Sequence, residues 1–291
     1  MRIDLHTHST ASDGLLSPDR LVRVAREHAV STLALTDHDT TEGVDEALAA
    51  GRRYGVDVIP GVEINTDVGE HEVHILGYYI DHDDGTFQAF LGRRREARVR
   101  RAEEMVRRLS ALGVRVEWAR VREIASGAAV GRPHIARALV EAGRVASAQE
   151  AFERFLGRNG PAYVPRAPLA PEDAVEVIAG AGGVPVLAHP GWASGGPVLE
   201  RVPRLVARGL AGIEVYYPDH TPEMVDAYRT IADRYRLVAT GGTDYHGGGA
   251  RTGHAQLGSL PMPAEVVPAL RARWMSAPAR RNLPAGDARP S

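Results

Sequence analysis

Short apolar runs alternate with amphipathic segments along most of the chain. Residues 32–36 form a nearly continuous apolar run, which is typical of a strand buried on both faces of a sheet. The segment after Ser17-Pro18 repeats its apolar residues at helical spacing instead, and this pair is typical of a helix start. Alternating strands and helices predict an α/β fold with a parallel sheet. The predicted strands cover residues 2–8, 32–36, 56–60, 72–79, 184–188, 212–216 and 237–240.

The pattern changes between residues 83 and 163, where nearly every segment has helical spacing. We interpret 83–163 as a helical insertion domain within a discontinuous barrel domain formed by 1–82 and 164–276. The tail at 277–291 is rich in Pro, Arg and small residues, so we expect it to be disordered.

One part of the helical segment is strongly basic. Glu96, Glu103 and Glu104 lie at helical range from its arginines, so we favour a solvated helix face with local ion pairs. Contact with a phosphate backbone is the alternative. The arginines concerned are Arg93, Arg94, Arg95, Arg98, Arg100 and Arg101.

Composition removes several kinds of chemistry. All 35 basic residues are Arg, which excludes a lysine Schiff base and a phosphate-binding loop of the Gly-Lys-Ser/Thr type. The chain has no Cys, so disulfides, thiolate nucleophiles and Cys-bound zinc are excluded as well. A metal ion would therefore have to bind His and carboxylate side chains. The formal net charge of -2 predicts no general attraction to nucleic acid or to anionic membranes.

The sequence also lacks the signals of secretion and membrane insertion. It enters directly into a predicted strand, without the basic and apolar regions of a signal peptide, and no apolar run is long enough to cross a bilayer. We therefore expect a cytoplasmic protein without membrane contact.

Histidines and carboxylates gather where the predicted strands end. His6 and His8 are two positions apart on the first strand, so both side chains point to the same side and could hold one ion together. The full set comprises His6, His8, Asp13, His38, Glu63, His74, His189, Asp244 and His246. These nine groups exceed what one tetrahedral ion binds, so we predict two or three ions with Glu63 or another carboxylate as a bridge. A ligand set without sulfur suits Mn²⁺, Fe²⁺ or Zn²⁺.

Each member of this set also has an ordinary interpretation. A histidine at a strand end is more often a hydrogen-bonded surface or core residue than a ligand. Asp37 and Asp39 either orient His38 or cap the next helix. The recurrence of such groups after several strands nevertheless favours a metal site.

Five linked segments match the motifs of a known family. They are Asp4-Leu5-His6-Thr7-His8-Ser9, Thr36-Asp37-His38-Asp39, Gly61-Val62-Glu63, Ala188-His189-Pro190 and Gly242-Thr243-Asp244-Tyr245-His246. In these segments the chain resembles the PHP (polymerase and histidinol phosphatase) family. The resemblance implies a distorted (β/α)7 barrel with three divalent metal ions, for which we expect Mn²⁺. It also implies three ligand groups, which are His6, His8, Glu63 and Asp244, then Glu63, His74 and His189, and finally Asp13, His38 and His246.

Two segments of the helical insertion narrow the resemblance further. Residues 131–136, and residues 155–158 followed by 163–165, look like the PHP subgroup that hydrolyses nucleoside 5'-monophosphates such as AMP and 3',5'-nucleotide bisphosphates. Relatives in that subgroup also trim short single-stranded RNA from the 5' end. The resemblance implies a phosphoric ester hydrolase whose nucleotide substrate contacts Arg132, His134 and Arg158. A helix N-terminal charge is the alternative role of Arg132.

The expected mechanism follows from the charge of a phosphate ester. Ions roughly 3.5–4 Å apart can bridge a hydroxide and clamp the phosphoryl oxygens for in-line attack. Asp244 and His189 would then serve catalysis as well as metal binding. His220 could donate a proton to the leaving oxygen, and turn capping is its alternative role.

Two other functions are open at this point. Histidinol phosphatase would use the same barrel and metals, although the Arg-rich insertion argues against it. A metal-stabilised PHP module that binds a partner without turnover belongs to a different class. The complete ligand set argues against a module that has lost its catalytic activity. We also expect no obligate protein partner.

Overall fold

Seven strands form one sheet in the order in which they occur along the chain. The computed structural model describes residues 2–127, 129–191, 196–248 and 255–277. The tail predicted to be disordered lies, apart from Ala277, outside these residues. The strands are β1 (Arg2–Thr7), β2 (Val30–Leu35), β3 (Asp57–Val68), β4 (His71–Tyr78), β5 (Val184–Leu187), β6 (Gly212–Tyr216) and β7 (Val238–Gly241).

The α/β class is confirmed, but the prediction of a wholly parallel sheet is wrong. β4 runs antiparallel to both β3 and β5, while the other neighbouring strands are parallel. Only Gly69 and Glu70 separate β3 from β4, and so short a connection can join only antiparallel strands. Gly69 has a φ of +58°, a conformation that glycine adopts without strain. β3 also continues well beyond residue 60, where we expected it to end.

The two edges of the sheet approach each other at one point. Thr7 and Tyr245 form an isolated parallel bridge. The N–H of His8 donates to the carbonyl of Tyr245 at 2.9 Å, and the N–H of Tyr245 donates to the carbonyl of His6 at 3.2 Å. This bridge brings the segment after β7 next to β1, and a closed seven-stranded barrel stays a prediction.

Helices pack against the sheet and begin where the sequence provides caps. Ser17 accepts from the N–H of Arg20 at 3.2 Å, and Thr221 accepts from the N–H of Met224 at 3.3 Å, each followed by a proline. The helices outside residues 83–163 are α1 (Pro18–Glu27), α2 (Val44–Tyr54), α7 (Pro171–Gly180), α8 (Gly196–Leu199), α9 (Val202–Ala207), α10 (Pro222–Tyr235) and α11 (Val266–Ser276). No helix among the described residues is both long and apolar enough to span a membrane.

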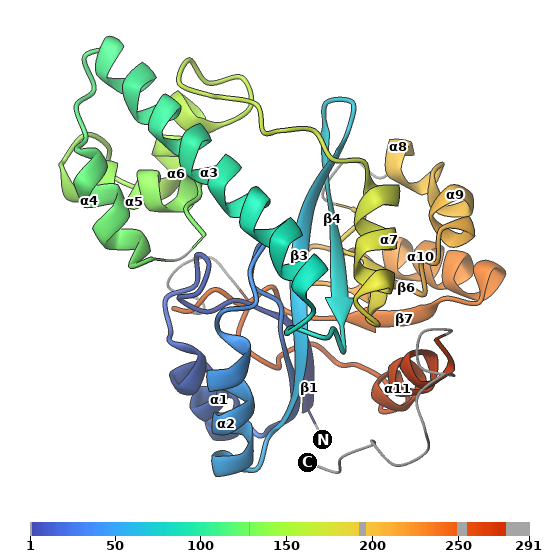
Figure 1. Cartoon of the computed structure of the whole chain (residues 1–291). Helices are drawn as coiled ribbons and strands as arrows, with labels where there is room; N and C mark the ends of the chain where they lie inside the picture. The colour runs from blue at the N-terminus through green and yellow to red at the C-terminus, as the bar shows by residue number, and fades with distance from the viewer. Residues whose placement is uncertain (1, 128, 192–195, 249–254, 278–291) are drawn as a thin grey trace.

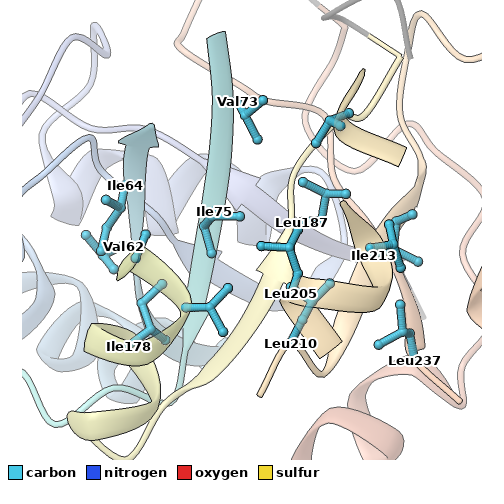
Figure 2. Packing of buried hydrophobic residues seen from close by; sticks show 14 of the residues in the cluster. Val62, Ile64, Val73, Ile75, Ile178, Leu187, Leu205, Leu210, Ile213 and Leu237 are labelled. Carbon is cyan, nitrogen blue, oxygen red and sulfur yellow. The ribbon is translucent and has the colours of Figure 1, made fainter. Parts of the chain in front are cut away.

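The largest apolar cluster lies between the sheet and four of these helices, α7, α8, α9 and α10. Figure 2 shows Ile64 of β3, Ile75 of β4 and Leu187 of β5 packed toward Ile178 of α7 and Leu205 of α9. This packing holds the strands in place beside the candidate ligands, since Ile64 and Ile75 directly follow Glu63 and His74.

Residues 83–163 contain helices only, apart from turns and loops, in the part that the structure describes. Figure 1 shows α3 running from beside β4 to a group of shorter helices beyond the sheet. That group has its own apolar cluster, formed by residues from Ala102 to Ala162. Its treatment as a separate insertion domain stays our proposal. The helices are α3 (Gly85–Ala111), α4 (Trp118–Ala125), α5 (Arg132–Glu141), α6 (Ala148–Ala151) and the π-helix η1 (Phe152–Leu156).

Candidate metal centre

Glu63 and His74 lie inside their strands, whereas we expected them at strand ends. That expectation is wrong because β3 and β4 extend as a hairpin past the end of β2. The hairpin sets Glu63 beside His38, and the two form an isolated parallel bridge. The N–H of Glu63 donates to the carbonyl of Asp37 at 3.1 Å, and the N–H of Asp39 donates to the carbonyl of Glu63 at 2.9 Å. A buried carboxylate is thus fixed next to the histidine that follows β2.

His6 and His8 face two carboxylates. His6 Nε2 lies 3.3 Å from both Glu63 Oε2 and Asp244 Oδ1, and His8 Nε2 lies 3.2 and 3.1 Å from the same oxygens. All four atoms are buried and form no hydrogen bond with any described residue. Two buried imidazole nitrogens that face two buried carboxylate oxygens are a donor set that divalent ions bind. The residues therefore fit a metal ion at this point.

Glu63 faces different histidines with its two oxygens. Oε1 lies 2.6 Å from His74 Nδ1 and 3.1 Å from His189 Nε2, while Oε2 lies 2.9 Å from His38 Nδ1. One carboxylate placed between two sets of imidazoles could bridge two ions, and the bridge predicted at Glu63 or another carboxylate stays a prediction.

Asp13 gathers the remaining predicted ligands. Its carboxylate lies 3.3 Å from His246 Nε2, 3.8 Å from His38 Nε2 and 3.9 Å from His8 Nδ1. These four residues offer ligand atoms that all lie within 4.8 Å of one another. The structure therefore brings all nine predicted ligands into one cluster, and their division among ions stays a prediction.

Without a metal ion, the charges of this cluster favour an ionised Glu63 and protonated rings at His8 and His74. Burial alone would raise the pKa of Glu63, but His38 and His74 hold that pKa well below its usual range. Burial opposes protonation of His8, yet Asp244 and Glu63 outweigh it and raise the pKa of His8 to about 10. In the same way Glu63 and Glu72 raise the pKa of His74 to about 9. Metal ions must therefore compete with protons for these nitrogens.

Glu214 is a functional candidate that the sequence reasoning missed. It lies in the middle of β6, fully buried, with Oε1 3.2 Å from His6 Nδ1. It also accepts from the N–H of His189 at 2.7 Å. Glu214 thus fixes the ring of one ligand and the backbone of another. The available signal was a carboxylate inside an otherwise apolar strand.

Asp37 and Asp39 do not hydrogen-bond the ring of His38, and Gly43 rather than either aspartate precedes α2. Asp37 accepts from Ser9 and Ser12, at 2.6 Å from each hydroxyl, and so holds the loop that carries Asp13. Asp39 has a φ of +51° and pairs with Arg98 of α3 at 2.6 Å. A left-handed non-glycine residue held this way is strained backbone beside a site.

A cavity of about 750 Å³ extends from the ligand cluster to the helices of residues 83–163. Arg94, Arg98 and Arg101 line it, because positions i, i+4 and i+7 share one face of α3. Arg98 and Arg94 pair with Asp39, at 2.6 and 3.7 Å. The predicted solvated face is therefore wrong for this side of the helix. It is right for Arg100, which is exposed and pairs with Glu96 at 3.6 Å.

Only one of the three predicted substrate contacts lines the cavity. Arg132 does so at the start of α5, with its guanidinium 5.6 Å from the ring centre of Phe152. His134 is buried and caps α5, since its Nδ1 accepts from the N–H of Gly131 at 3.0 Å. Arg158 lies 3.5 Å from Asp67 and does not line the cavity.

His220 lies behind the cavity wall. Its Nδ1 donates to the carbonyl of Val215 at 2.9 Å, and it does not line the cavity. Burial lowers the pKa of His220, so its ring is neutral at pH 7. Tyr217 occupies the wall instead and donates its hydroxyl to Asp244 Oδ2 at 3.1 Å, which leaves Oδ1 facing the histidines.

The cluster and its cavity agree with the known proteins that this chain resembles. Residues 4–156 match the model of the PHP domain. A 3',5'-nucleoside bisphosphate phosphatase from Chromobacterium violaceum is 37% identical, over 97% of this chain and 99% of that protein. The 5'-3' exoribonuclease Rnm of Salmonella typhimurium is 38% identical, over 84% of each chain.

The fold of this chain also matches that of a solved structure. The crystal structure of a Bifidobacterium adolescentis protein assigned as a metal-dependent phosphoesterase superposes with a TM-score of 0.86 at 33% identity, covering 93% of this chain and 95% of that chain. Both of the relatives named above span most of the chain and are named as phosphoric ester hydrolases. The chain belongs to the PHP family and is a metal-dependent phosphoesterase.

Proposed function

We propose that this phosphoesterase hydrolyses nucleotides, with 3',5'-nucleotide bisphosphates as the preferred substrates and AMP-like 5'-monophosphates as poorer ones. One observation supports this most strongly. A single cavity joins the ligand cluster to six arginines, Arg94, Arg98, Arg101, Arg132, Arg137 and Arg166. The ligand cluster can take the phosphate that is cleaved, and the arginines offer charge-assisted hydrogen bonds to a second phosphate.

The proposed centre holds three divalent ions, with Mn²⁺ as the expected metal. His6, His8, Glu63 and Asp244 would hold one ion, Glu63, His74 and His189 a second, and Asp13, His38 and His246 a third. When bound, these ions supply positive charge beside the phosphate and a water of lowered pKa. Glu214 and Tyr217 keep His6 and Asp244 oriented toward them.

The arginines set the position of the substrate in this proposal. The guanidinium of Arg132 lies 5.6 Å from the ring centre of Phe152 and 5.9 Å from that of Tyr163, so the two rings orient its planar group before a ligand arrives. Arg101 Nη2 is buried and makes no hydrogen bond with a described residue, which leaves a donor for an anion. We assign no proton transfer to His220, because it lies outside the cavity lining.

Three alternatives to this proposal are another nucleic-acid substrate, histidinol phosphate, and a module without turnover. Short single-stranded RNA with a 5'-phosphate is the second candidate, since a relative is named a 5'-3' exoribonuclease. Histidinol phosphate carries an ammonium group, which the surrounding arginines would repel. The complete ligand cluster argues against a metal-stabilised module without turnover. The cytoplasmic location predicted from the sequence stays a proposal.

A four-substrate assay tests the proposal. The protein, reconstituted with Mn²⁺, is given adenosine 3',5'-bisphosphate, AMP, a short 5'-phosphorylated RNA and histidinol phosphate. We expect the highest kcat/KM for the bisphosphate and the lowest for histidinol phosphate. A higher kcat/KM for histidinol phosphate than for both nucleotides would overturn the assignment, and a higher value for RNA would favour the second candidate.

A further inference from the structure

Glu72 places a negative charge in the middle of the arginines. It lies in β4 and lines the cavity, with its side chain 19% exposed. Its Oε2 accepts from Arg132 Nη2 at 3.1 Å, and its Oε1 forms an ion pair with Arg166. Oε1 also lies 3.1 Å from Nε2 of His74, a predicted metal ligand. Glu72 is thus a carboxylate placed between two guanidinium groups.

The carboxylate of Glu72 pairs with the same guanidinium groups, those of Arg132 and Arg166, that an incoming phosphate would bind. Arg132 and Arg166 are mostly buried, with side chains 17% and 10% exposed, so solvent screens them little. Burial and the charges of Arg132 and Arg166 also lower the pKa of Arg101 to about 10, which indicates close like charges. A carboxylate and a phosphate bind guanidinium groups in the same way. Glu72 and a bound anion therefore compete for one set of donors.

We propose that Glu72 is a specificity-determining residue, an internal counter-anion that a second phosphate must displace from Arg132 and Arg166. This inference rests on the proposed function. A phosphate tethered to a nucleotide competes well, because the first phosphate already anchors it near the arginines and gives it a high effective concentration. A free anion such as inorganic phosphate has no anchor and loses to Glu72. The cavity thereby discriminates a tethered second phosphate from free anions.

A purely structural role predicts the opposite sign. If Glu72 only held the ring of His74, its removal would weaken metal binding and leave anion binding unchanged or weaker. If it is a counter-anion, its removal must tighten the binding of free anions. Damage to the site does not produce tighter binding, so this readout separates the two roles.

The test uses inorganic sulfate as the probe. Calorimetry measures its Kd on the full-length, manganese-loaded wild type and on the Glu72→Gln variant, and manganese content is determined for both. We expect Glu72→Gln to lower the sulfate Kd about tenfold, the scale of a buried charge pair removed from competition. Adding Arg132→Ala to Glu72→Gln should return the Kd toward the wild-type value.

Asp67→Asn serves as a matched control. Asp67 also lies near Arg166, at 3.8 Å, but it does not line the cavity, so a smaller change in sulfate Kd is expected. An unchanged or higher sulfate Kd in Glu72→Gln overturns the proposal, and so does a tightening that survives Arg132→Ala. Because sulfate binding is measured without turnover, these results are independent of the nucleotide assay that tests the proposed function.

Discussion

The carboxylate of Glu214 lies 3.2 Å from Nδ1 of His6, on the far side of the ring from Nε2, which faces Glu63 and Asp244. A proton on Nδ1 that is donated to Glu214 leaves the Nε2 lone pair free for an ion. The same carboxylate accepts from the N–H of His189. Glu214 therefore contacts two of the nine ligands predicted from the sequence without being one of them.

Glu214→Gln should weaken metal binding while the fold survives. We expect Mn²⁺ affinity to fall about 10–100-fold, the usual cost of losing a group that orients a ligand. Calorimetric titration with Mn²⁺ measures this affinity, and circular dichroism checks the fold. Glu176→Gln is the control, because Glu176 is exposed and pairs with Arg208 away from the cavity. Equal Mn²⁺ affinity in wild type and Glu214→Gln would contradict the role of Glu214.

Asp244→Asn should lower metal content and turnover together. The substitution preserves the shape of the side chain but removes the charge that faces His6 and His8 at 3.3 and 3.1 Å. Metal analysis after dialysis and an assay with a nucleotide substrate provide the two readouts. A variant that keeps both its manganese and wild-type turnover would mean that the site is misplaced.

Arg132→Ala should penalise substrates with a second phosphate. The lost charge-assisted hydrogen bonds should cost a 3',5'-bisphosphate about 1.5–3 kcal/mol in kcat/KM, whereas p-nitrophenyl phosphate should lose less. Arg158→Ala is the comparison, and its smaller expected cost follows from its place outside the cavity lining. Equal losses for both substrates in Arg132→Ala would place this residue on the cleaved phosphate instead.

Metal affinity should rise with pH. In the metal-free protein the pKa of His8 is about 10 and that of His74 about 9, so both nitrogens carry protons at pH 7. A bound ion displaces these protons, so the apparent affinity increases as pH rises toward 9 and levels off above about 10. Calorimetric titrations in buffers of different ionisation enthalpy count the protons released. Binding without proton release at pH 7 would contradict these pKa shifts.

The strands and the ligand types were predictable because their signals are local. Apolar runs identified the seven strands, and the histidines near their ends identified the cluster. The direction of β4 was missed because β3 appeared to end at residue 60, which concealed the two-residue turn at Gly69 and Glu70.

Contacts between distant segments could not be read from the sequence in the same way. The arginine face of α3 has a visible spacing at Arg94, Arg98 and Arg101, but its partner Asp39 lies far away in the chain. Glu72 and Glu214 are single carboxylates within strands, and only the fold brings them to Arg132 and His6. Residue type and spacing predicted the candidate ligands, whereas the groups that orient and neutralise them required the tertiary structure.

The most direct test of this account is nucleotide hydrolysis before and after metal removal. Protein treated with a strong chelator and shown by elemental analysis to be metal-free is assayed with adenosine 3',5'-bisphosphate, then again after addition of Mn²⁺. We predict that hydrolysis is abolished by metal removal and restored by Mn²⁺ as the ligand cluster refills. Undiminished hydrolysis by the verified metal-free protein would contradict the account.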